Sequence, residues 1–249
     1  MDGRSSLSFA GRVAVVTGGG GGIGAAIATA LARAGAKVAL VGRTAVTLAA
    51  TAGAFGQENA DASLVLPTDV TDEHQVGEAL GVVHNRWKRL DIVVNAAGLN
   101  IRDRALSEIS LDGWRAVNDA NLVGPLLVAR AALPVMRLQG AGDIVNISST
   151  AGLTATLLSG PAYSASKAAL NSLTASINLA ERRHGIRAML ICPGDVSTPL
   201  LERWPEPPTA QERARMLQPE DVADVVLAGL SLPARALLEI AVLRPRWQP

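Results

Sequence analysis

The sequence predicts an α/β protein in which helices cover both faces of a doubly wound, mostly parallel sheet of seven strands. Short runs rich in Val, Ile and Leu alternate along the chain with longer Ala-rich stretches of helical periodicity. The short runs are almost continuously apolar, which is typical of parallel strands buried on both faces. This alternation favours an open sheet over a barrel.

The expected strands are residues 12–17, 37–42, 63–67, 90–95, 143–148, 186–192 and 238–244. The expected helices are residues 23–34, 45–55, 72–88, 111–138 and 162–184, with a further helix that begins at Pro219. Helix signals support these starts, because Ser110 is a good N-cap and Asp72 with Gln75 resembles a capping box. Pro219 indicates another helix start, because proline is common at the first position of a helix.

Residues 195–217 are the least regular segment and contain four prolines. A loop of this length in a compact protein is typical of a lid over a binding site, and a disordered insertion is the alternative. The composition does not change along the chain, so residues 1–249 are expected to form a single domain.

Composition excludes several classes of protein. With 49% apolar and 18% charged residues the chain can build a large core, and a net charge of +1 gives no reason to expect nucleic acid or an anionic membrane as partner. No apolar run approaches the ~18 residues of a membrane span, and residues 1–11 lack the apolar stretch of a signal peptide. Cys192 is the single cysteine, which fits a reducing compartment. A cytoplasmic protein is expected.

A glycine-rich run from Thr17 to Gly24 directly follows the first expected strand and opens the first expected helix. Glycine permits a tight turn and lets a pyrophosphate approach the backbone, while the helix N-terminus offers free N–H groups and a positive dipole. A flexible linker, which has a similar composition, is the alternative. The position of the glycine-rich run between a buried strand and a helix favours a dinucleotide site.

The only tyrosine, Tyr163, precedes Lys167 by four residues in an expected helix, so both side chains lie on one face. A cation about 4 Å from the phenol favours the phenolate by at most roughly 4 kcal/mol, which would bring the tyrosine pKa from ~10 towards ~7. The pair is therefore a candidate proton donor, and an exposed helix surface is the alternative. His74, His84 and His184 are scattered without metal-ligand spacing, so no metal is expected.

Together these motifs make the chain resemble the short-chain dehydrogenase/reductase family over nearly its whole length. The Thr-Gly-x-x-x-Gly-Ile-Gly pattern is met by Thr17, Gly18, Gly22, Ile23 and Gly24. The resemblance implies a Rossmann fold and an NAD(P)-dependent oxidoreductase. The cofactor-binding residues that it implies are Gly18, Gly22, Ile23, Gly24, Asp69, Val70, Asn95, Ala96, Gly98, Tyr163, Lys167, Pro193, Gly194, Val196 and Thr198.

The end of the second strand bears on the choice of cofactor. NAD-specific members carry an acid there that holds the ribose 2′-hydroxyl and would repel a 2′-phosphate. This chain has Gly42 at that position and Arg43 next to it, a planar cation suited to phosphate. We therefore expect a preference for NADP(H), with NAD(H) possible, and a surface role for Arg43 is the alternative.

The resemblance also implies a catalytic group of Asn121, Ser149, Tyr163 and Lys167. Ser148 competes with Ser149, which is preferred because Thr150, Ala151 and Gly152 follow it as in relatives. In the family, Tyr163 would donate a proton to a ketone oxygen that Ser149 polarises. Lys167 would lower the Tyr163 pKa and bind the nicotinamide ribose, and Asn121 would hold a water that leads to solvent.

The leading hypothesis is an NADP(H)-dependent alcohol dehydrogenase or ketone reductase. A 3-oxoacyl-thioester reductase of the acyl-carrier-protein type is the alternative. A carrier would favour basic residues near the mouth of the site, and the candidates are Arg102, Arg104, Arg203, Arg213 and Arg215. A nucleotide-sensing protein without catalysis is a third hypothesis. The candidate substrate walls are mostly apolar and predict an uncharged or apolar small molecule: Leu99, Asn100, residues 153–158, Asp195, Leu200, Leu201 and Trp204.

Assembly is expected from the helix that begins near Ala162, which is rich in small side chains that permit close helix packing. The corresponding helices pair across two-fold axes in the family, so a homodimer or homotetramer is expected. Packing of these small residues on the protein's own sheet is the alternative.

Overall fold

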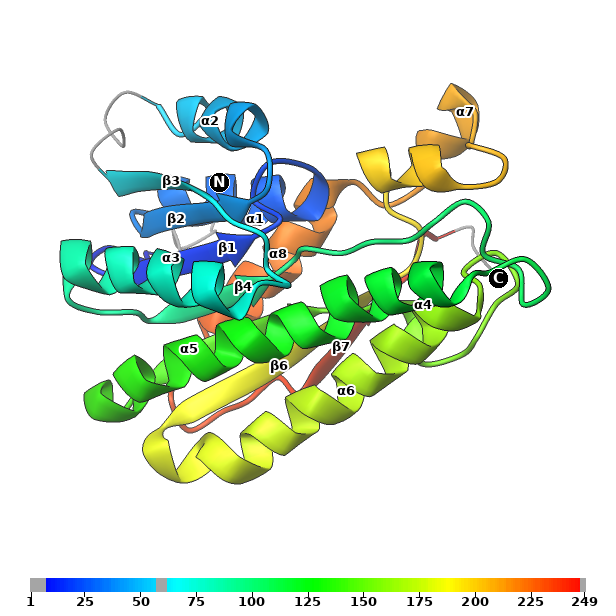
Figure 1. The fold of residues 1–249 in the computed structure, drawn as a ribbon. Helices are drawn as coiled ribbons and strands as arrows, with labels where there is room; N and C mark the ends of the chain where they lie inside the picture. Colours follow the sequence, from blue (N-terminus) through cyan, green and yellow to red (C-terminus); the bar gives the residue numbers. More distant parts are fainter. Residues whose placement is uncertain (1–7, 57–61, 247–249) are drawn as a thin grey trace.

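The computed structural model describes residues 8–56 and 62–246 and has one sheet of seven parallel strands in the order β3-β2-β1-β4-β5-β6-β7 (Figure 1). The predicted fold class is confirmed, and the strands begin and end within two residues of the expected positions. Residues 1–7, on which part of the signal-peptide expectation rests, lie outside the described residues. The strands are β1 Val13–Thr17, β2 Lys37–Gly42, β3 Ser63–Pro67, β4 Ile92–Asn95, β5 Gly142–Ile147, β6 Ile186–Pro193 and β7 Ile240–Leu243.

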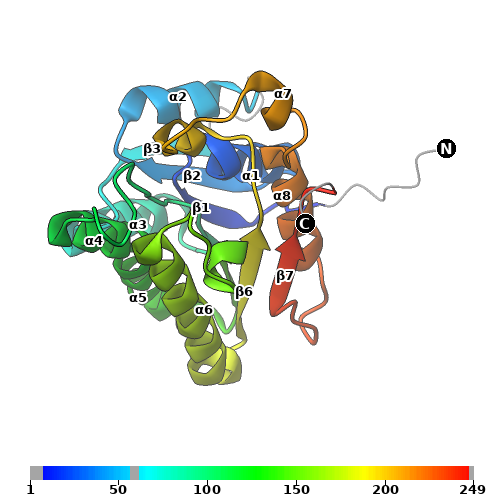
Figure 2. The ribbon, with the colours of Figure 1, turned by 90° about the vertical axis from the view of Figure 1, so that its right-hand side faces the viewer.

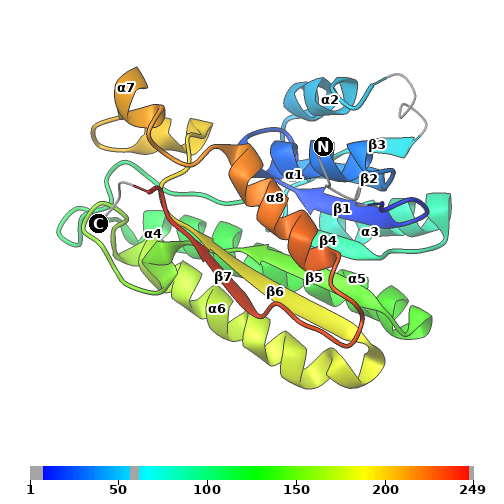
Figure 3. The same cartoon turned by 180° about the vertical axis from the view of Figure 1, so that it is seen from behind.

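Helices cover both faces of this sheet (Figure 2). Alternate residues of each strand face opposite layers, so Ala14 and Val16 pack in one core while Val13 and Val15 pack in the other. Helices α1 Gly22–Arg33 and α8 Pro219–Leu230 cover the first core, seen in front of the strands in Figure 3. The second is covered by α3 Glu73–Trp87, α5 Gly124–Gln139 and α6 Pro161–Glu181, and α2 Ala45–Gly53 packs near the β2–β3 edge.

The helix expected over residues 111–138 is interrupted, which corrects the sequence analysis. It consists of α4 Leu111–Asn118, a π-helical turn Asp119–Val123, and α5. The cause is the Asn121 side chain, which is fully buried and hydrogen-bonded to the backbone of Leu99 instead of facing solvent. A π-turn widens the helix by one residue and is common at functional sites.

By length and composition alone, Leu111–Gln139 would be able to cross a membrane, with a mean hydropathy of 1.3. One face of the stretch is instead buried inside the protein, while Leu111 and Leu138 are exposed. Val128, Ala132 and Met136 of α5 are fully buried in the core between this helix and the sheet. The stretch is therefore a core helix.

The segment 195–217 is less irregular than expected. It contains a short 3₁₀ helix, Pro199–Arg203, and the short helix α7 Ala210–Arg213, whose start carries a capping box between Thr209 and Glu212. A β-bridge between Val196 and Leu217 joins the two ends of the segment. The segment thus leaves and re-enters the body at one place.

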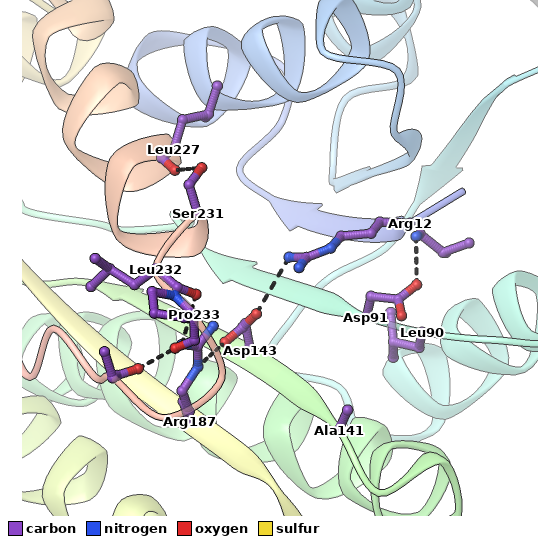
Figure 4. Close-up of polar contacts among 12 residues, drawn as sticks. Arg12, Leu90, Asp91, Ala141, Asp143, Arg187, Leu227, Ser231, Leu232 and Pro233 are labelled. Atoms are coloured by element: carbon purple, nitrogen blue, oxygen red, sulfur yellow. Dashed lines mark hydrogen bonds and ion pairs between the residues drawn. The ribbon is translucent and has the colours of Figure 1, made fainter. Parts of the chain in front are cut away.

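A charged cluster joins the amino ends of the strands, at the edge of the sheet opposite to the glycine turn (Figure 4). The buried carboxylate of Asp143 at the start of β5 accepts a 2.8 Å hydrogen bond from Arg187 Nε of β6 and lies 3.6 Å from Arg12 Nη1. Arg187 also donates to the carbonyl oxygens of Leu232, Pro233 and Ala236, which lead from α8 to β7. One carboxylate therefore ties three strands and a loop.

We expect the Asp143→Asn variant to lose roughly 2 kcal/mol of unfolding free energy, because it removes the carboxylate charge from the hydrogen bond with the partly buried Arg187. The measurement is urea denaturation of both proteins. Asp112→Asn is the matched control, because Asp112 pairs with Arg115 at 3.6 Å with its side chain 95% exposed, and a loss below about 1 kcal/mol is expected from this pair and its place in the first turn of α4. Equal stability of the two variants would contradict the assigned role of Asp143.

Candidate active site

The turn after β1 is packed directly against the chain that leaves β4. Gly18 has a φ of +65°, and a Cβ atom there would lie 2.8 Å from the Ala97 nitrogen, so no other residue fits. The Thr17 hydroxyl oxygen accepts hydrogen bonds of 3.2 Å from the backbone N–H groups of both Ala96 and Ala97. These contacts fix the two strand ends on either side of one crevice.

The glycine turn leaves the start of α1 open to an anion. A Cβ atom at Gly24 would lie 2.3 Å from the Gly18 carbonyl oxygen, which shows how closely the helix packs on the turn. The N-cap residue of α1 is Gly21, and no side chain caps the helix. The N–H groups of the first turn are therefore available to a negatively charged group, as a pyrophosphate would require.

Two neighbouring cavities meet at this turn, and both are lined by Gly18 and Gly98. The smaller, of about 460 Å³, is also lined by Arg43, Asp69 and Val70. Neither cavity is lined by Asn95 or Asn121, which are buried behind the walls. The larger, of about 700 Å³, brings together most of the predicted site residues: Gly18, Gly22, Ile23, Gly24, Ala96, Gly98, Ser149, Tyr163, Lys167, Pro193, Gly194, Val196 and Thr198.

Tyr163 and Lys167 lie one turn apart near the start of α6, on the face that lines the larger cavity. Lys167 is 4% exposed, and its Nζ donates a 2.8 Å hydrogen bond to the carbonyl oxygen of Ile147 at the end of β5. The same nitrogen lies 5.6 Å from the centre of the Tyr163 ring. Burial lowers the pKa of Lys167 to about 8.

The expectation that Lys167 lowers the Tyr163 pKa is wrong for this structure. Burial raises the pKa of Tyr163 to about 12, although part of the side chain remains open to the cavity. A hydrogen bond with Ser149 and the charge of Arg104 oppose this shift. The Lys167 ammonium donates to the Ile147 carbonyl, and Lys167 is not among the groups that shift the Tyr163 pKa.

The two competing serines have different surroundings. Ser148 is 3% exposed, and its hydroxyl donates a 2.6 Å hydrogen bond to Asn171 Oδ1 of α6. Ser149 is less buried, and its hydroxyl oxygen accepts a 3.1 Å hydrogen bond from the Ala151 N–H while contacting Tyr163. Ser149 is thus the serine hydrogen-bonded to the phenol.

Asn121 reaches the site from the π-turn. Its Oδ1 accepts a hydrogen bond from the Leu99 N–H, and its Nδ2 donates to the Leu99 carbonyl and to Ser166 Oγ. A Cβ atom at Gly98 would lie 3.5 Å from Asn121 Oδ1 and 3.8 Å from Lys167 Nζ. The amide and the ammonium therefore converge on the backbone of Gly98.

The side chain of Asn95 is buried beneath the crevice and lines neither cavity. It is 2% exposed, and its Nδ2 donates to Asn146 Oδ1 on the neighbouring strand. Asn146 in turn donates to Thr174 of α6. This buried chain of hydrogen bonds anchors α6 to the strand ends below Tyr163.

Sequence reasoning missed the placement of Arg104, which is 3% exposed and lines the larger cavity together with Tyr163. The residue lies in a polar loop without periodicity, so the sequence offered no signal beyond its charge. Within residues 8–56 and 62–246 no cluster of His, Cys, Asp or Glu is suited to a metal ion.

A doubly wound sheet with a glycine turn at its strand-order reversal, and a Tyr–Lys helix beside that turn, defines a nucleotide-binding oxidoreductase. The sequence profile described as "short chain dehydrogenase" matches residues 12–208. The chain belongs to this family, and it is an oxidoreductase.

Similar proteins cover nearly the whole chain. An uncharacterized oxidoreductase of Staphylococcus aureus (strain USA300) is 37% identical over 234 residues, which are 94% of this chain and 97% of the relative. An alcohol dehydrogenase of the archaeon Thermococcus sibiricus, solved with 5-hydroxy-NADP, is 28% identical with a TM-score of 0.85, covering 96% of this chain and 98% of its own. A metagenomic short-chain oxidoreductase in complex with NADP is 32% identical with a TM-score of 0.80, covering 98% and 100%.

Because Tyr163 is the only tyrosine, near-ultraviolet absorbance of phenolate reports on it alone. We expect the folded protein to ionise at about pH 12, and the unfolded chain near ~10. A raised pKa in the folded state contributes stability that is fully present below ~10 and is lost as pH rises through about 12. A folded-state midpoint at or below that of the unfolded chain would refute the assigned burial effect.

Proposed function

We propose that this protein is an NADP(H)-dependent oxidoreductase that interconverts a ketone and a secondary alcohol. The observation that carries the proposal is the presence of Tyr163, Ser149 and Lys167 on the wall of the cavity that the glycine turn also lines. The structurally similar alcohol dehydrogenase with its bound NADP analogue supports the same class of reaction.

The residues of this chain supply proton transfer and position. NADP(H), when bound, supplies or accepts the hydride. Tyr163 is protonated at neutral pH because burial raises its pKa, so it is suited to donate a proton to the substrate oxygen during reduction. The Ser149 hydroxyl, hydrogen-bonded to Tyr163, holds and polarises the same oxygen.

Lys167 and Asn121 act on position and proton supply. Lys167 is held by the Ile147 carbonyl and faces Gly98, where it would bind the ribose hydroxyls of the cofactor. Asn121 Oδ1 lies near the same point beside Gly98, and we assign to Asn121 a water that leads from Lys167 to solvent. Residues of the glycine turn and Thr198 would hold the pyrophosphate.

Arg43 supports NADP(H) over NAD(H). It lines the smaller cavity together with Gly42 and Thr44. None of these three residues, which end β2 and follow it, is an acid that could select a ribose 2′-hydroxyl. Within the part of the chain that the structure describes, no carboxylate pairs with Arg43, so its guanidinium is available to a 2′-phosphate.

The cavity walls support an uncharged substrate of moderate size. Leu158, Leu200, Leu201 and Trp204 give an apolar surface. Asp195, Arg104 and Arg203 add charges of both signs to the same wall, so it favours neither an anion nor a cation. Burial raises the pKa of Asp195. Leu99 lines only the smaller cavity, and Leu157 is fully exposed, so neither is part of this wall.

An acyl-carrier substrate is the second candidate, although two of the five arginines that could bind a carrier serve other roles. Arg104 is buried in the wall, and Arg213 pairs with Glu202 within the segment 195–217. Loss of catalysis gains no support, since the Tyr–Ser–Lys arrangement is complete. Cofactor oxidation with a panel of ketones, an acyl thioester included, separates these alternatives.

We further propose a single cytoplasmic domain over residues 1–249 with residues 195–217 as a lid, assembled into a homodimer or homotetramer. The small residues Ala165, Ala168, Ser172 and Ala175 of α6 are exposed, so they do not pack on the protein's own sheet. Leu179 of the same helix is 72% exposed. A molecular mass by light scattering tests the assembly.

We expect Tyr163→Phe to lower kcat for ketone reduction by about 10²-fold or more, since the variant keeps the ring and removes the proton donor. Binding of NADPH, measured by fluorescence titration, should be unchanged. Substantial residual activity would refute the assignment of Tyr163.

We expect Arg43→Ala to lower the ratio of kcat/KM for NADPH over NADH by at least about tenfold, because a charge-assisted contact with the 2′-phosphate is lost. The efficiency with NADH should stay near that of the wild type. An unchanged ratio would remove Arg43 from cofactor selection.

A further inference from the structure

The guanidinium of Arg104 joins three separate segments at the wall of the larger cavity. Nε donates a 2.6 Å hydrogen bond to the carbonyl of Ile101 in its own loop, and Nη1 donates at 3.1 Å to the carbonyl of Leu158. Nη2 donates to the carbonyl of Arg203, at the end of the short helix Pro199–Arg203. All three guanidinium nitrogens are therefore used on backbone carbonyls.

This cation has no acidic partner. In the part of the chain that the structure describes, none of the ion pairs involves Arg104, although its side chain is 3% exposed. A guanidinium stays charged in a protein interior, so the carbonyl dipoles alone offset the loss of hydration. The carbonyls do not neutralise its charge, and this charge lowers the pKa of the Tyr163 phenol.

The loop of Arg104 also packs against the start of α6, three residues before Tyr163. Gly160 has a φ of +73°, and a Cβ atom there would lie 2.6 Å from the Arg104 carbonyl oxygen. The loop, the proposed lid and the helix that carries Tyr163 therefore meet at one side chain.

The base of the proposed lid is held elsewhere. The Val196–Leu217 bridge joins its two ends. Thr198 packs against the glycine turn, because a Cβ atom at Gly22 would lie 3.2 Å from its methyl group. Arg102 is the neighbouring cation of the Arg104 loop, and it makes one 3.5 Å contact with the Glu202 carbonyl while remaining exposed. The buried Leu201 side chain and the Arg213–Glu202 ion pair also hold this short helix, and Arg104 holds its Arg203 end.

We propose that Arg104 is a positioning residue, a latch that fastens residues 199–204 across the substrate cavity and fixes a positive charge on the Tyr163 side of that cavity. A lysine does not replace it, because an ammonium is a point donor and cannot span three carbonyls as a planar fork does. The kinetic part of this proposal rests on the proposed function, and the structural part does not.

Trypsin tests the latch directly, because the bond after Arg203 is a cleavage site. Native full-length protein is digested, and cleavage after Arg203 is followed by mass spectrometry. We expect Arg104→Met to be cleaved at least about tenfold faster than the wild type, with Arg104→Lys in between, because charge-assisted hydrogen bonds are lost. The matched control Arg102→Met should be cleaved within about twofold of the wild-type rate.

Kinetics then test the charge. We expect Arg104→Met to raise KM for the ketone at unchanged KM for NADPH, and to raise the apparent pKa of alcohol oxidation by about half a unit or more. Arg104→Lys should loosen the lid, but its apparent pKa of alcohol oxidation should stay close to that of the wild type, because the variant keeps the positive charge. An identical pH profile in Arg104→Met would overturn the assigned charge effect.

Cleavage of folded Arg104→Met at the wild-type rate would overturn the latch, with folding checked by thermal unfolding. If Arg104→Met does not fold, Arg104→Lys carries the same comparison. Wild-type protein inactive on every ketone would refute the proposed function alone, because the trypsin result requires no turnover.

Discussion

The contact between the turn after β1 and the chain leaving β4 is the constraint on which the site depends. Gly18 has no room for a side chain against Ala97, and the Thr17 hydroxyl binds the N–H groups that follow β4. This contact sets the position of Gly98, on which Asn121 and Lys167 converge. A shift of the turn would therefore move the glycine loop and the reactive side chains together.

Burial, and not a neighbouring amine, dominates the electrostatics of the site. The pKa values of Tyr163 and Lys167 both shift toward the neutral forms because burial removes water from both side chains. The Ile147 carbonyl holds the ammonium in one direction, and Ser149 and Arg104 are the groups that favour the phenolate. The loop residue Arg104 thus adds a second cation to the cavity wall, beside Lys167 on the helix that carries the phenol.

The features readable from the sequence are those with local patterns. Apolar β-branched runs gave the strands, and the glycine turn with the Tyr163–Lys167 spacing gave the site because both depend on a few consecutive residues. The π-turn was not readable, since residues 119–123 look helical and only the Leu99 backbone explains why Asn121 turns inward. The role of Arg104 and the shift of the Tyr163 pKa depend on contacts between segments far apart in the chain. Composition and periodicity therefore cannot predict them.

The charged cluster around Asp143 lies at the amino ends of the strands, whereas every group assigned to chemistry lies at their carboxyl ends. The charged cluster that stabilises the sheet and the groups that carry the chemistry are therefore separated by the length of the strands. Loops around the catalytic crevice can acquire new side chains over evolutionary time without loosening the clamp at the far rim. An architecture of this kind accommodates new substrate repertoires while its framework stays intact.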